Sequence, residues 1–550
     1  MLIFLRQLSF GLVLITQSAA PWPADGPDGG ASQVHVHIER LLDSRELETL
    51  GERVYMQDLL REIYAADAYR PLWTSADKVG QMLSLMRDSA SHGLQPHDYH
   101  LQLIEKLNGS MGAASGPGEL ASLDILLTDG LLLYAYHRRY GKVKAHDLDA
   151  NINFKREAFS DTEPAEAVRQ ALEAEDLPAF VDSLAPAAEY YDGLRAQLLR
   201  YRELAAGGGW PEVPAGPTLR LGDRDSRVIP LRQRLQIEGE LPPAAGSAAD
   251  QFDAELELAV RNFQERYGLD SDGLAGQKTI AAMNIPARAR VDQLRLSLER
   301  LRWVAQEADE VFIAVNIAGF RVSFVRQRKV IWTSRVIIGT AYRKTPVFRA
   351  DITYVEFNPT WTVPPTILRE DTLPALKRDP AYLKTKNLSV FDSSGRRVDP
   401  ATIDWTAFGK TMPFTLRQEP GPNNALGRVK LIFPNPHFVF MHDTPQRELF
   451  MRPERTFSSG CIRVEDALAL AKLLLEDTPA FNPASLQSVL DAGRTRRVVL
   501  AKPIPVLILY LTAALDASGK ARFYQDVYQR DAAELRALDG AVTVDLPRPR

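Results

Sequence analysis

Cysteine is nearly absent from this sequence, in which Cys461 is the one cysteine among 550 residues. A single thiol cannot form a disulfide within the chain, so a fold stabilised by internal disulfides is excluded. In an oxidising compartment a lone thiol is a liability unless it is buried or used in chemistry. Cys461 is therefore the first residue to consider when looking for a function.

The sequence also lacks an excess of charge of either sign. It has 66 Lys and Arg and 70 Asp and Glu, for a net charge of −4 and a pI near 6.2. This balance gives no indication of a nucleic-acid partner, and any charge-guided recognition must be local. Hydrophobic residues make up 45% and charged residues 25%, which is typical of globular proteins. The length predicts about three or four domains.

Long apolar runs are missing beyond the first residues of the chain. Val506–Leu511 is too short to cross a membrane as a helix, because a helix needs about 20 residues to do so. At the N-terminus, Arg6 precedes the apolar stretch Leu8–Ile15, and Ser18-Ala19-Ala20 offers the small residues that a signal peptidase reads. We expect residues 1–20 to be a secretory signal or an uncleaved anchor, with a buried helix as the alternative.

The spacing of apolar residues divides the rest of the chain. Residues 34–205 have a helical pattern and end in a Gly- and Pro-rich linker at 205–217. Residues 218–285 predict a small three-helix bundle, in which Leu256, Val260, Phe263 and Tyr267 recur at helical spacing.

Residues 306–535 change to a pattern that is rich in strands. Short runs of β-branched and aromatic residues predict strands at 311–317, 321–325, 330–338, 352–358, 429–433, 438–441, 497–500 and 506–511. Residues 365–424 are too long for an ordinary connection and predict an inserted cap or lid. The predicted fold class is α+β multidomain, with a helical scaffold, a small three-helix bundle and a β-rich domain that carries the insert.

His442 and Cys461 form the constellation with most chemical meaning. Cys461 follows Gly460 in a turn, 19 residues after His442 ends a β-type run. A thiol needs a base to become a nucleophile, and an imidazole can take the proton and return it to a leaving amine. Backbone N–H groups must stabilise the oxyanion, and Gly460 lacks the Cβ that would crowd it. Arg463 is suited to bind a substrate carboxylate, to fix the turn or to favour the thiolate.

Two histidines lie beyond residue 290, and we choose between them by position. Strand alternation predicts that His437 and His442 face opposite sides. We select His442 because it ends the run and precedes a turn. The alternative is structural, with Cys461 a small buried residue and His442 a satisfied core histidine. The sole cysteine, its turn, the histidine and the export signal together favour catalysis.

The segment Ser458-Ser459-Gly460-Cys461-Ile462-Arg463, with the preceding His442, resembles the catalytic signature of L,D-transpeptidases. Many members have histidine where Ser459 stands, and Ser-Ser-Gly-Cys resembles their large Gram-negative subclass. This departure leaves the group that orients His442 open, with a backbone carbonyl as one candidate. Matching pieces elsewhere are Gly339-Thr340, Tyr342–Pro346 and Asn358–Ile367, which includes Trp361.

Two further regions resemble parts of the same proteins. Residues 218–285 resemble the small peptidoglycan-binding domain through Leu221-Gly222-Asp223, Ala259–Gln264, Gly268-Leu269 and Asp272–Gly276. Residues 34–205 resemble the helical scaffold of the large subclass.

The resemblance implies a periplasmic enzyme that forms 3→3 cross-links between peptidoglycan stem peptides through a thioester on Cys461. It implies His442 as base, Gly460 and Ser459 in the oxyanion turn, and Arg463 and Trp361 in contact with substrate. Stem peptides and glycan strands would be the partners, together with other cell-wall synthesis proteins. Carbapenems would acylate the thiol. No metal and no cofactor is implied.

Other functions fit the same sequence. Water as acceptor would make the chain an L,D-carboxypeptidase, and a protein acceptor would make it a wall-attachment enzyme. A non-catalytic peptidoglycan-binding protein is the alternative without chemistry.

Overall fold

A computed structural model of the chain describes residues 30–110, 115–154, 164–183, 189–242, 249–304, 310–479 and 481–544. The expected signal or anchor at residues 1–20 lies outside these residues. Every helix within them is too short or too polar to cross a bilayer.

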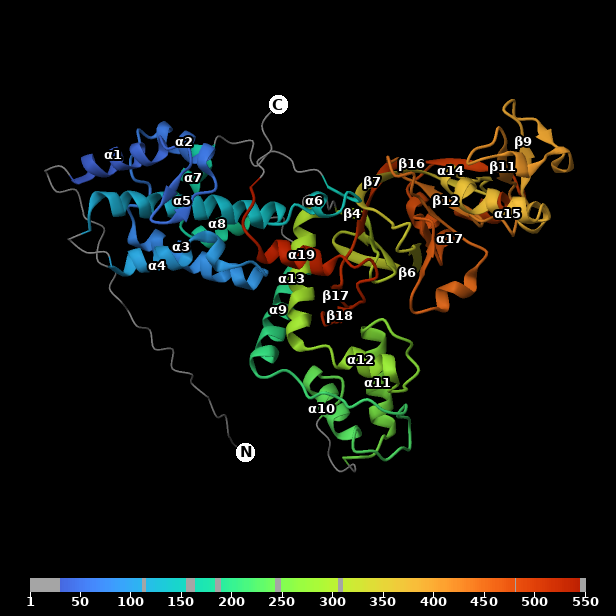
Figure 1. Ribbon diagram of the computed structural model, residues 1–550, viewed down its shortest axis with the longest axis horizontal. Helices are drawn as coiled ribbons and strands as arrows, with labels where there is room; N and C mark the ends of the chain where they lie inside the picture. Colours follow the sequence, from blue (N-terminus) through green and yellow to red (C-terminus); the bar gives the residue numbers. More distant parts are fainter. Residues whose placement is uncertain are drawn as a thin grey trace.

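The helical scaffold lies at one end of the molecule (Figure 1). It consists of α1 (Gly30–Leu42), α2 (Gln57–Ala66), α3 (Ala76–Asp88), α4 (Leu101–Ser110), α5 (Pro117–Tyr140), α6 (Ala145–Leu148), α7 (Pro164–Glu173) and α8 (Leu177–Ser183), with the short hairpin of β1 (Glu48–Thr49) and β2 (Glu52–Arg53). Helix α5 is buried along nearly its whole length. It is buried on all sides, as a central helix must be, and its buried polar residues include Asp124 and Asp129, which accept hydrogen bonds from neighbouring segments.

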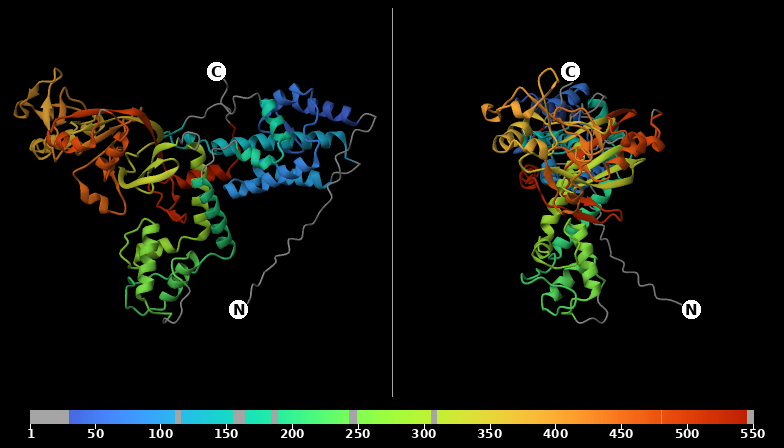
Figure 2. Two further views of the ribbon diagram at one scale, coloured as in Figure 1. Left: turned by 180° about the vertical axis from the view of Figure 1, so that it is seen from behind. Right: turned by 90° about the vertical axis from the view of Figure 1, so that its right-hand side faces the viewer.

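Two long helices connect the scaffold to the rest of the chain. α9 (Glu189–Ala206) and α13 (Ala287–Val304) lie side by side and lead to the bundle of α10 (Val228–Glu238), α11 (Ala254–Arg266) and α12 (Gln277–Met283) (Figures 1 and 2). The bundle projects from the junction and shares a core with both long helices.

The β-rich domain is a ten-stranded sheet that closes on itself. Its strands are β3 (Ile152–Asn153), β4 (Val311–Asn316), β5 (Arg321–Arg326), β6 (Lys329–Gly339), β7 (Val347–Phe357), β12 (Val429–Ile432), β13 (Met441–His442), β14 (Thr456–Ser458), β15 (Ile462–Val464) and β16 (Arg496–Leu509). The order β12-β13-β15-β6-β5-β4-β16-β7 is closed by pairing of β7 with β12. Closure gives each strand of this order a partner on both sides along at least part of its length. Helices α17 (Ala467–Leu475) and α18 (Leu486–Asp491) share its apolar core.

The insert forms a subdomain at the far end of the β-rich domain (Figure 1). It has a four-stranded sheet of β8 (Trp361–Thr362), β9 (Ser389–Phe391), β10 (Arg397–Val398) and β11 (Thr415–Gln418), with α14 (Pro365–Ile367), α15 (Leu373–Arg378) and α16 (Tyr382–Thr385). Its small apolar core is separate from that of the main sheet.

The C-terminal segment returns to the junction of the domains. It comprises β17 (Ala513–Leu515), β18 (Ala521–Phe523) and α19 (Asp531–Asp539), and α19 packs against α13. This arrangement confirms the α+β multidomain class.

Some expected strands were wrong in detail. The run at 438–441 is a loop that yields only the two-residue strand β13, because Asn435 binds the backbone of this loop and Phe438 has a positive φ of 56°. The separate strands at 497–500 and 506–511 are one strand, β16, which bends at an irregularity between Val499 and Ile504.

Candidate active site

Three neighbouring strands bring the candidate residues onto one face of the sheet. His442 in β13 lies opposite Lys430 in β12 and opposite Arg463 in β15. Residues that pair directly across strands project from the same face. Met441 and Ile462 point the other way into the core, and both are fully buried. The row Lys430–His442–Arg463 therefore forms the face opposite to the core.

Cys461 shares this face with His442. It lies two residues before Arg463, and the Ile462 N–H donates to the Phe440 carbonyl at 3.1 Å, which continues the pairing up to the thiol. Residues two apart in a strand face the same side. Cys461 is partly exposed as a residue, and its Sγ lies 3.9 Å from the carbonyl oxygen of Phe438.

The backbone fixes the tautomer of His442. Its Nδ1 lies 2.5 Å from the Asp443 carbonyl oxygen, which only accepts hydrogen bonds, so Nδ1 carries the proton. The lone pair is then on Nε2. The Asp443 carboxylate is engaged elsewhere, by the Arg428 N–H at 2.9 Å and by Arg447 at 3.0 Å.

Both reactive groups are neutral at neutral pH. Burial lowers the pKa of His442 to about 3, and the charges of Arg463 and Lys430 act in the same direction. Burial raises the pKa of the Cys461 thiol, while the Phe440 N–H, Lys430 and Arg463 oppose that rise. The resting site therefore holds a neutral thiol and a neutral imidazole on the same face of the sheet.

The turn before the thiol is built by Ser458 and Gly460. Ser458 Oγ donates to the Cys461 carbonyl at 2.5 Å and accepts from the Gly460 N–H at 3.1 Å. Gly460 has a φ of 112°, a conformation that favours glycine. Its carbonyl accepts from Thr345 Oγ1 at 2.9 Å, and the same hydroxyl accepts from the Gly339 N–H.

Ser459 connects this turn to the insert. Its exposed hydroxyl accepts from Arg343 Nη1 at 3.0 Å. The same guanidinium pairs with Glu370 at 2.8 Å and with Asp371 at 2.5 Å. One arginine thus links the turn before Cys461 to the start of the insert.

Arg463 and Trp361 occupy different surroundings. Arg463 Nη1 donates to Gln446 Oε1 at 2.7 Å, and burial lowers the pKa of the guanidinium. Trp361 pairs with Gln418 in β11 and packs against the core of the insert. The recorded contacts of Trp361 are thus in the insert, whereas Arg463 faces the thiol.

The strand alternation that we expected to distinguish His437 from His442 is not observed. His437 lies in the loop before β13, so strand alternation does not apply to it. Its ring packs 4.9 Å from that of Phe348. Sequence reasoning also missed Lys430, Phe440, Ser458 and Thr345. Ser458 and Thr345 had a signal, because they stand in the matching segments Ser458–Arg463 and Tyr342–Pro346.

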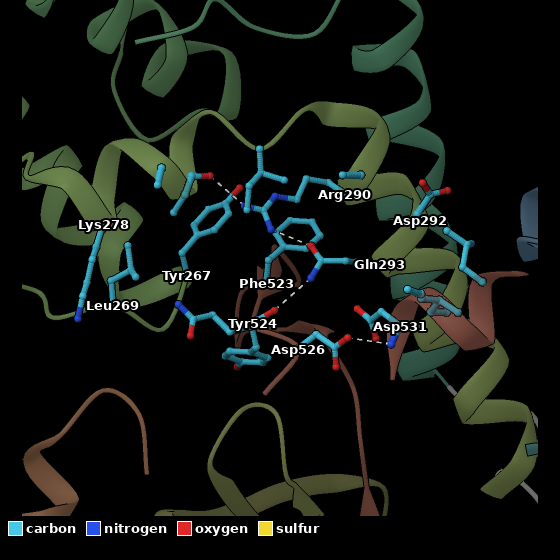
Figure 3. Close-up of a pocket in the computed structure, with 18 residues that line it drawn as sticks. Tyr267, Leu269, Lys278, Arg290, Asp292, Gln293, Phe523, Tyr524, Asp526 and Asp531 are labelled. Carbon is cyan, nitrogen blue, oxygen red and sulfur yellow. Dashed lines mark hydrogen bonds between the residues drawn. The ribbon is translucent and has the colours of Figure 1, made fainter. Parts of the chain in front are cut away.

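A cavity of about 580 Å³ lies elsewhere, between the bundle, α13 and the C-terminal segment (Figure 3). The side chains of Tyr267, Arg290 and Gln293 lie along it. Arg290 donates to Gln293 at 2.7 Å, and Gln293 donates to the Tyr524 carbonyl at 3.1 Å. Since its lining includes neither Cys461 nor His442, we assign the chemistry to the face around the thiol.

Comparison with known families identifies three regions of the chain. Residues 310–481 match the model described as "L,D-transpeptidase catalytic domain", and residues 224–283 match the "Putative peptidoglycan binding domain". Residues 58–198 match a "Scaffold domain". The expected resemblance to L,D-transpeptidases is confirmed, as is the presence of a peptidoglycan-binding domain.

Individual relatives cover parts of the chain. A protein of Haemophilus influenzae named "Putative L,D-transpeptidase" is 36% identical over 239 residues, which are 44% of this chain and 48% of that protein. "N-acetylmuramoyl-L-alanine amidase CwlM" of Mycobacterium tuberculosis is 36% identical over 80 residues, covering 13% of this chain and 20% of that protein. The chain thus spans about half the length of the first relative and a fifth of the second.

Solved structures add little to these matches. An L,D-transpeptidase from Stackebrandtia nassauensis is 13% identical, with a TM-score of 0.20, over 54% of this chain and 97% of that one. A score this low does not establish a shared fold.

Proposed function

We propose that this chain is a peptidoglycan L,D-transpeptidase with Cys461 as nucleophile and His442 as general base. The Sγ proton passes to His442 Nε2 while the sulfur bonds to the carbonyl carbon of the third stem residue, meso-diaminopimelate. The C–N bond to the terminal D-alanine then breaks, and His442 returns the proton to the leaving amine. The product of this step is a thioester.

In the second step, the side-chain amine of another stem peptide attacks the thioester. A C–N bond forms as the C–S bond breaks, and the amine proton passes through His442 to the sulfur. The result is a 3→3 cross-link.

The observation that carries this proposal is the shared face of the sheet. His442 lies in β13 and Cys461 directly precedes β15, the strand that pairs with β13, and the hydrogen bond from Nδ1 to Asp443 leaves Nε2 as the basic nitrogen. A thiol and a neutral imidazole on one face of the sheet form the minimum for cysteine acyl transfer.

The remaining site residues have supporting roles in the proposal. Gly460 shapes the oxyanion turn, and because its N–H is engaged by Ser458, we assign the oxyanion to the Cys461 N–H. Ser459 anchors Arg343, and Arg463 presents positive charge to the donor. Trp361 contacts the donor from the insert.

The proposed substrate and cellular location are based on the peptidoglycan-binding domain. The peptidoglycan-binding domain supports stem peptides and glycan strands as the substrate, outside the cytoplasm. Export by the N-terminal signal to the periplasm, acylation by carbapenems and contacts with other cell-wall synthesis proteins belong to the same proposal.

Intact-mass analysis with a purified tetrapeptide donor tests the chemistry. The wild-type chain should gain the mass of the acyl tripeptide on Cys461, and Cys461→Ala should gain none. New 3→3 dimers that persist with the variant would reject the proposal and favour a non-catalytic binding protein. Trials with water alone, a second stem or a candidate wall protein separate the carboxypeptidase, cross-linking and attachment reactions.

A further inference from the structure

Lys430 is a charged side chain beside the thiol that the proposed reaction does not yet use. It lies directly opposite His442 in the sheet. Its Nζ is 4.0 Å from the centroid of the Phe440 ring, which itself packs 5.6 Å from the ring of His442. Its charge acts on both Cys461 and His442. The ammonium group is therefore part of the face around the thiol.

This ammonium group is partly buried without a carboxylate beside it. Glu356 is its other cross-strand neighbour, but the recorded ion pair of Glu356 is with Arg497, at 3.7 Å. Among the described residues, no carboxylate is recorded within 4.0 Å of Lys430 Nζ. Burial of a cation is costly unless an anion compensates it, and an aromatic ring does so only in part. Burial lowers the pKa of Lys430 and outweighs the charge of Glu356, which favours the ammonium form. A cation that is only partly compensated beside a nucleophile indicates a place for an anion from the substrate.

Arg463, the other cation of the row, is in a different situation. Its guanidinium already donates to Gln446. Lys430 has no such recorded bond, and its ammonium is a point charge that can approach a carboxylate from many directions. Of the two cations, Lys430 is thus the better candidate for a ligand that arrives and leaves in each cycle.

We propose that Lys430 binds the C-terminal carboxylate of the donor stem peptide, one residue beyond the carbonyl that Cys461 attacks. This inference rests on the proposed function and adds a determinant of donor length to it. In a longer stem peptide, Lys430 would contact a neutral amide at the position of this carboxylate. The carboxylate departs with the leaving amino acid, so Lys430 should act on acylation and not on resolution of the thioester.

Two donors and three variants test this role. The donors are the tetrapeptide with a terminal carboxylate and the same peptide with a terminal carboxamide. The variants are Lys430→Met, Lys430→Arg and, as a matched control, Lys472→Met, which removes an exposed lysine from α17. The rate of Cys461 acylation is followed by intact mass at varied donor concentration.

We expect Lys430→Met to lower kcat/KM for the carboxylate donor about 10- to 100-fold, mainly through KM, because a charge-assisted bond is lost. For the carboxamide donor the loss should be less than about threefold, since there is no carboxylate to lose. Lys430→Arg should recover part of the lost rate, and Lys472→Met should behave as wild type. Resolution of a preformed thioester should be unchanged in every variant.

Equal losses for the two donors would overturn the inference, because Lys430 would then act only through the thiol or the fold. An unchanged rate for the carboxylate donor would also overturn it. If Lys430→Met fails to fold by thermal melting, Lys430→Gln carries the same comparison. Absence of wild-type acylation by either donor would instead reject the proposed function, and this inference with it.

Discussion

Buried cations have different partners at the junction of the domains and on the face around Cys461. At the junction, Arg300 donates to Glu534 and to Asp531, at 2.7 Å each. Lys142 pairs with Asp98 at 2.8 Å, and both of these side chains are almost fully buried. Each of these two cations thus has an anion of the protein within hydrogen-bond distance, whereas the buried Arg290 in α13 donates to the Gln293 amide and the Ala282 carbonyl.

On the face around Cys461 the corresponding cations contact neutral side chains. Lys430 lies over the ring of Phe440, and Arg463 donates to the amide of Gln446. Together they lower the pKa of the imidazole between them. Within the described part of the chain, this region therefore lacks the stabilising ion pairs that Arg300 and Lys142 form at the junction.

The difference separates structural charge from charge reserved for a ligand. A buried pair contributes little net stability, but the loss of one partner is costly because the other charge stays behind. A lone buried cation costs stability until an anion arrives. Changes at the junction should therefore alter stability, and changes at the face should alter chemistry.

The largest effect is expected from Cys461→Ala. Acylation by the tetrapeptide should fall at least about 10⁴-fold, because the nucleophile is lost. The melting temperature should stay close to that of the wild type, since Cys461 is partly exposed and its sulfur makes only weak contacts with the backbone of Phe438 and Phe440. A marked loss of stability would break the comparison, because it would make Cys461 a structural residue.

Asp98→Asn is expected to have the largest effect on stability. It leaves the Lys142 ammonium buried without its carboxylate, which should lower the free energy of unfolding of the scaffold by about 3 kcal/mol. Urea denaturation measures this change, and acylation in the folded state should be unaffected. Asp58→Asn is the matched control, because its partner Arg61 is on the surface and the Asp58 side chain is 93% exposed. That change should cost less than about 1 kcal/mol.

Gly460→Ala sharpens the comparison without a change of charge. A Cβ at this position would find its nearest atoms 3.8 Å away, so no clash is expected. The φ of 112° is still unfavourable for alanine, with a cost of about 1–3 kcal/mol. We expect acylation to slow at least about tenfold as the turn shifts.

Gly395 offers the control for that substitution. It also has a positive φ, 80°, with open space around it, but it lies in the turn between β9 and β10 of the insert. Gly395→Ala should cost similar stability and leave acylation intact. Equal slowing by both variants would show that strain, not the position of the turn, is responsible.

Much of this comparison could be predicted from local sequence. The periodicity of apolar residues predicted the scaffold, the bundle and the β-rich domain, because each pattern reflects the face that an element buries. Cys461 and His442 could be proposed because each has a local signal, a glycine turn and the end of a strand.

Residues that depend on long-range pairing could not be found in this way. Lys430 stands in an otherwise apolar strand, and only the register of β12 with β13 puts it opposite His442. The group that orients His442 is a main-chain carbonyl, which has no sequence signature. Likewise, Arg343 meets Ser459 and Asp371 only after the insert has folded back on the turn.

The smallest effect is expected from pH, and it follows from the burial of His442, to which the charges of Arg463 and Lys430 add. His442 has a pKa of about 3 in the folded chain, below its ordinary value of 6.5. Its imidazole should therefore remain a neutral base where an ordinary histidine is protonated. Acylation should change less than about twofold between about pH 7 and about pH 5. Single-turnover rates with the tetrapeptide measure this.

The same shift gives stability a defined direction with pH. Below pH 6.5, His442 is protonated in the unfolded chain but stays neutral in the folded chain. This residue therefore destabilises the fold as the pH falls from 6.5 towards 3. In a plot of acylation rate against pH, a loss of rate at acid pH (the acid limb) with a midpoint near pH 6.5 would contradict the lowered pKa of His442. In Lys430→Met the midpoint of the acid limb should move to higher pH, because one of the two cations that oppose protonation of the imidazole is gone. A midpoint that does not move would mean that the row of charges has no influence on the base.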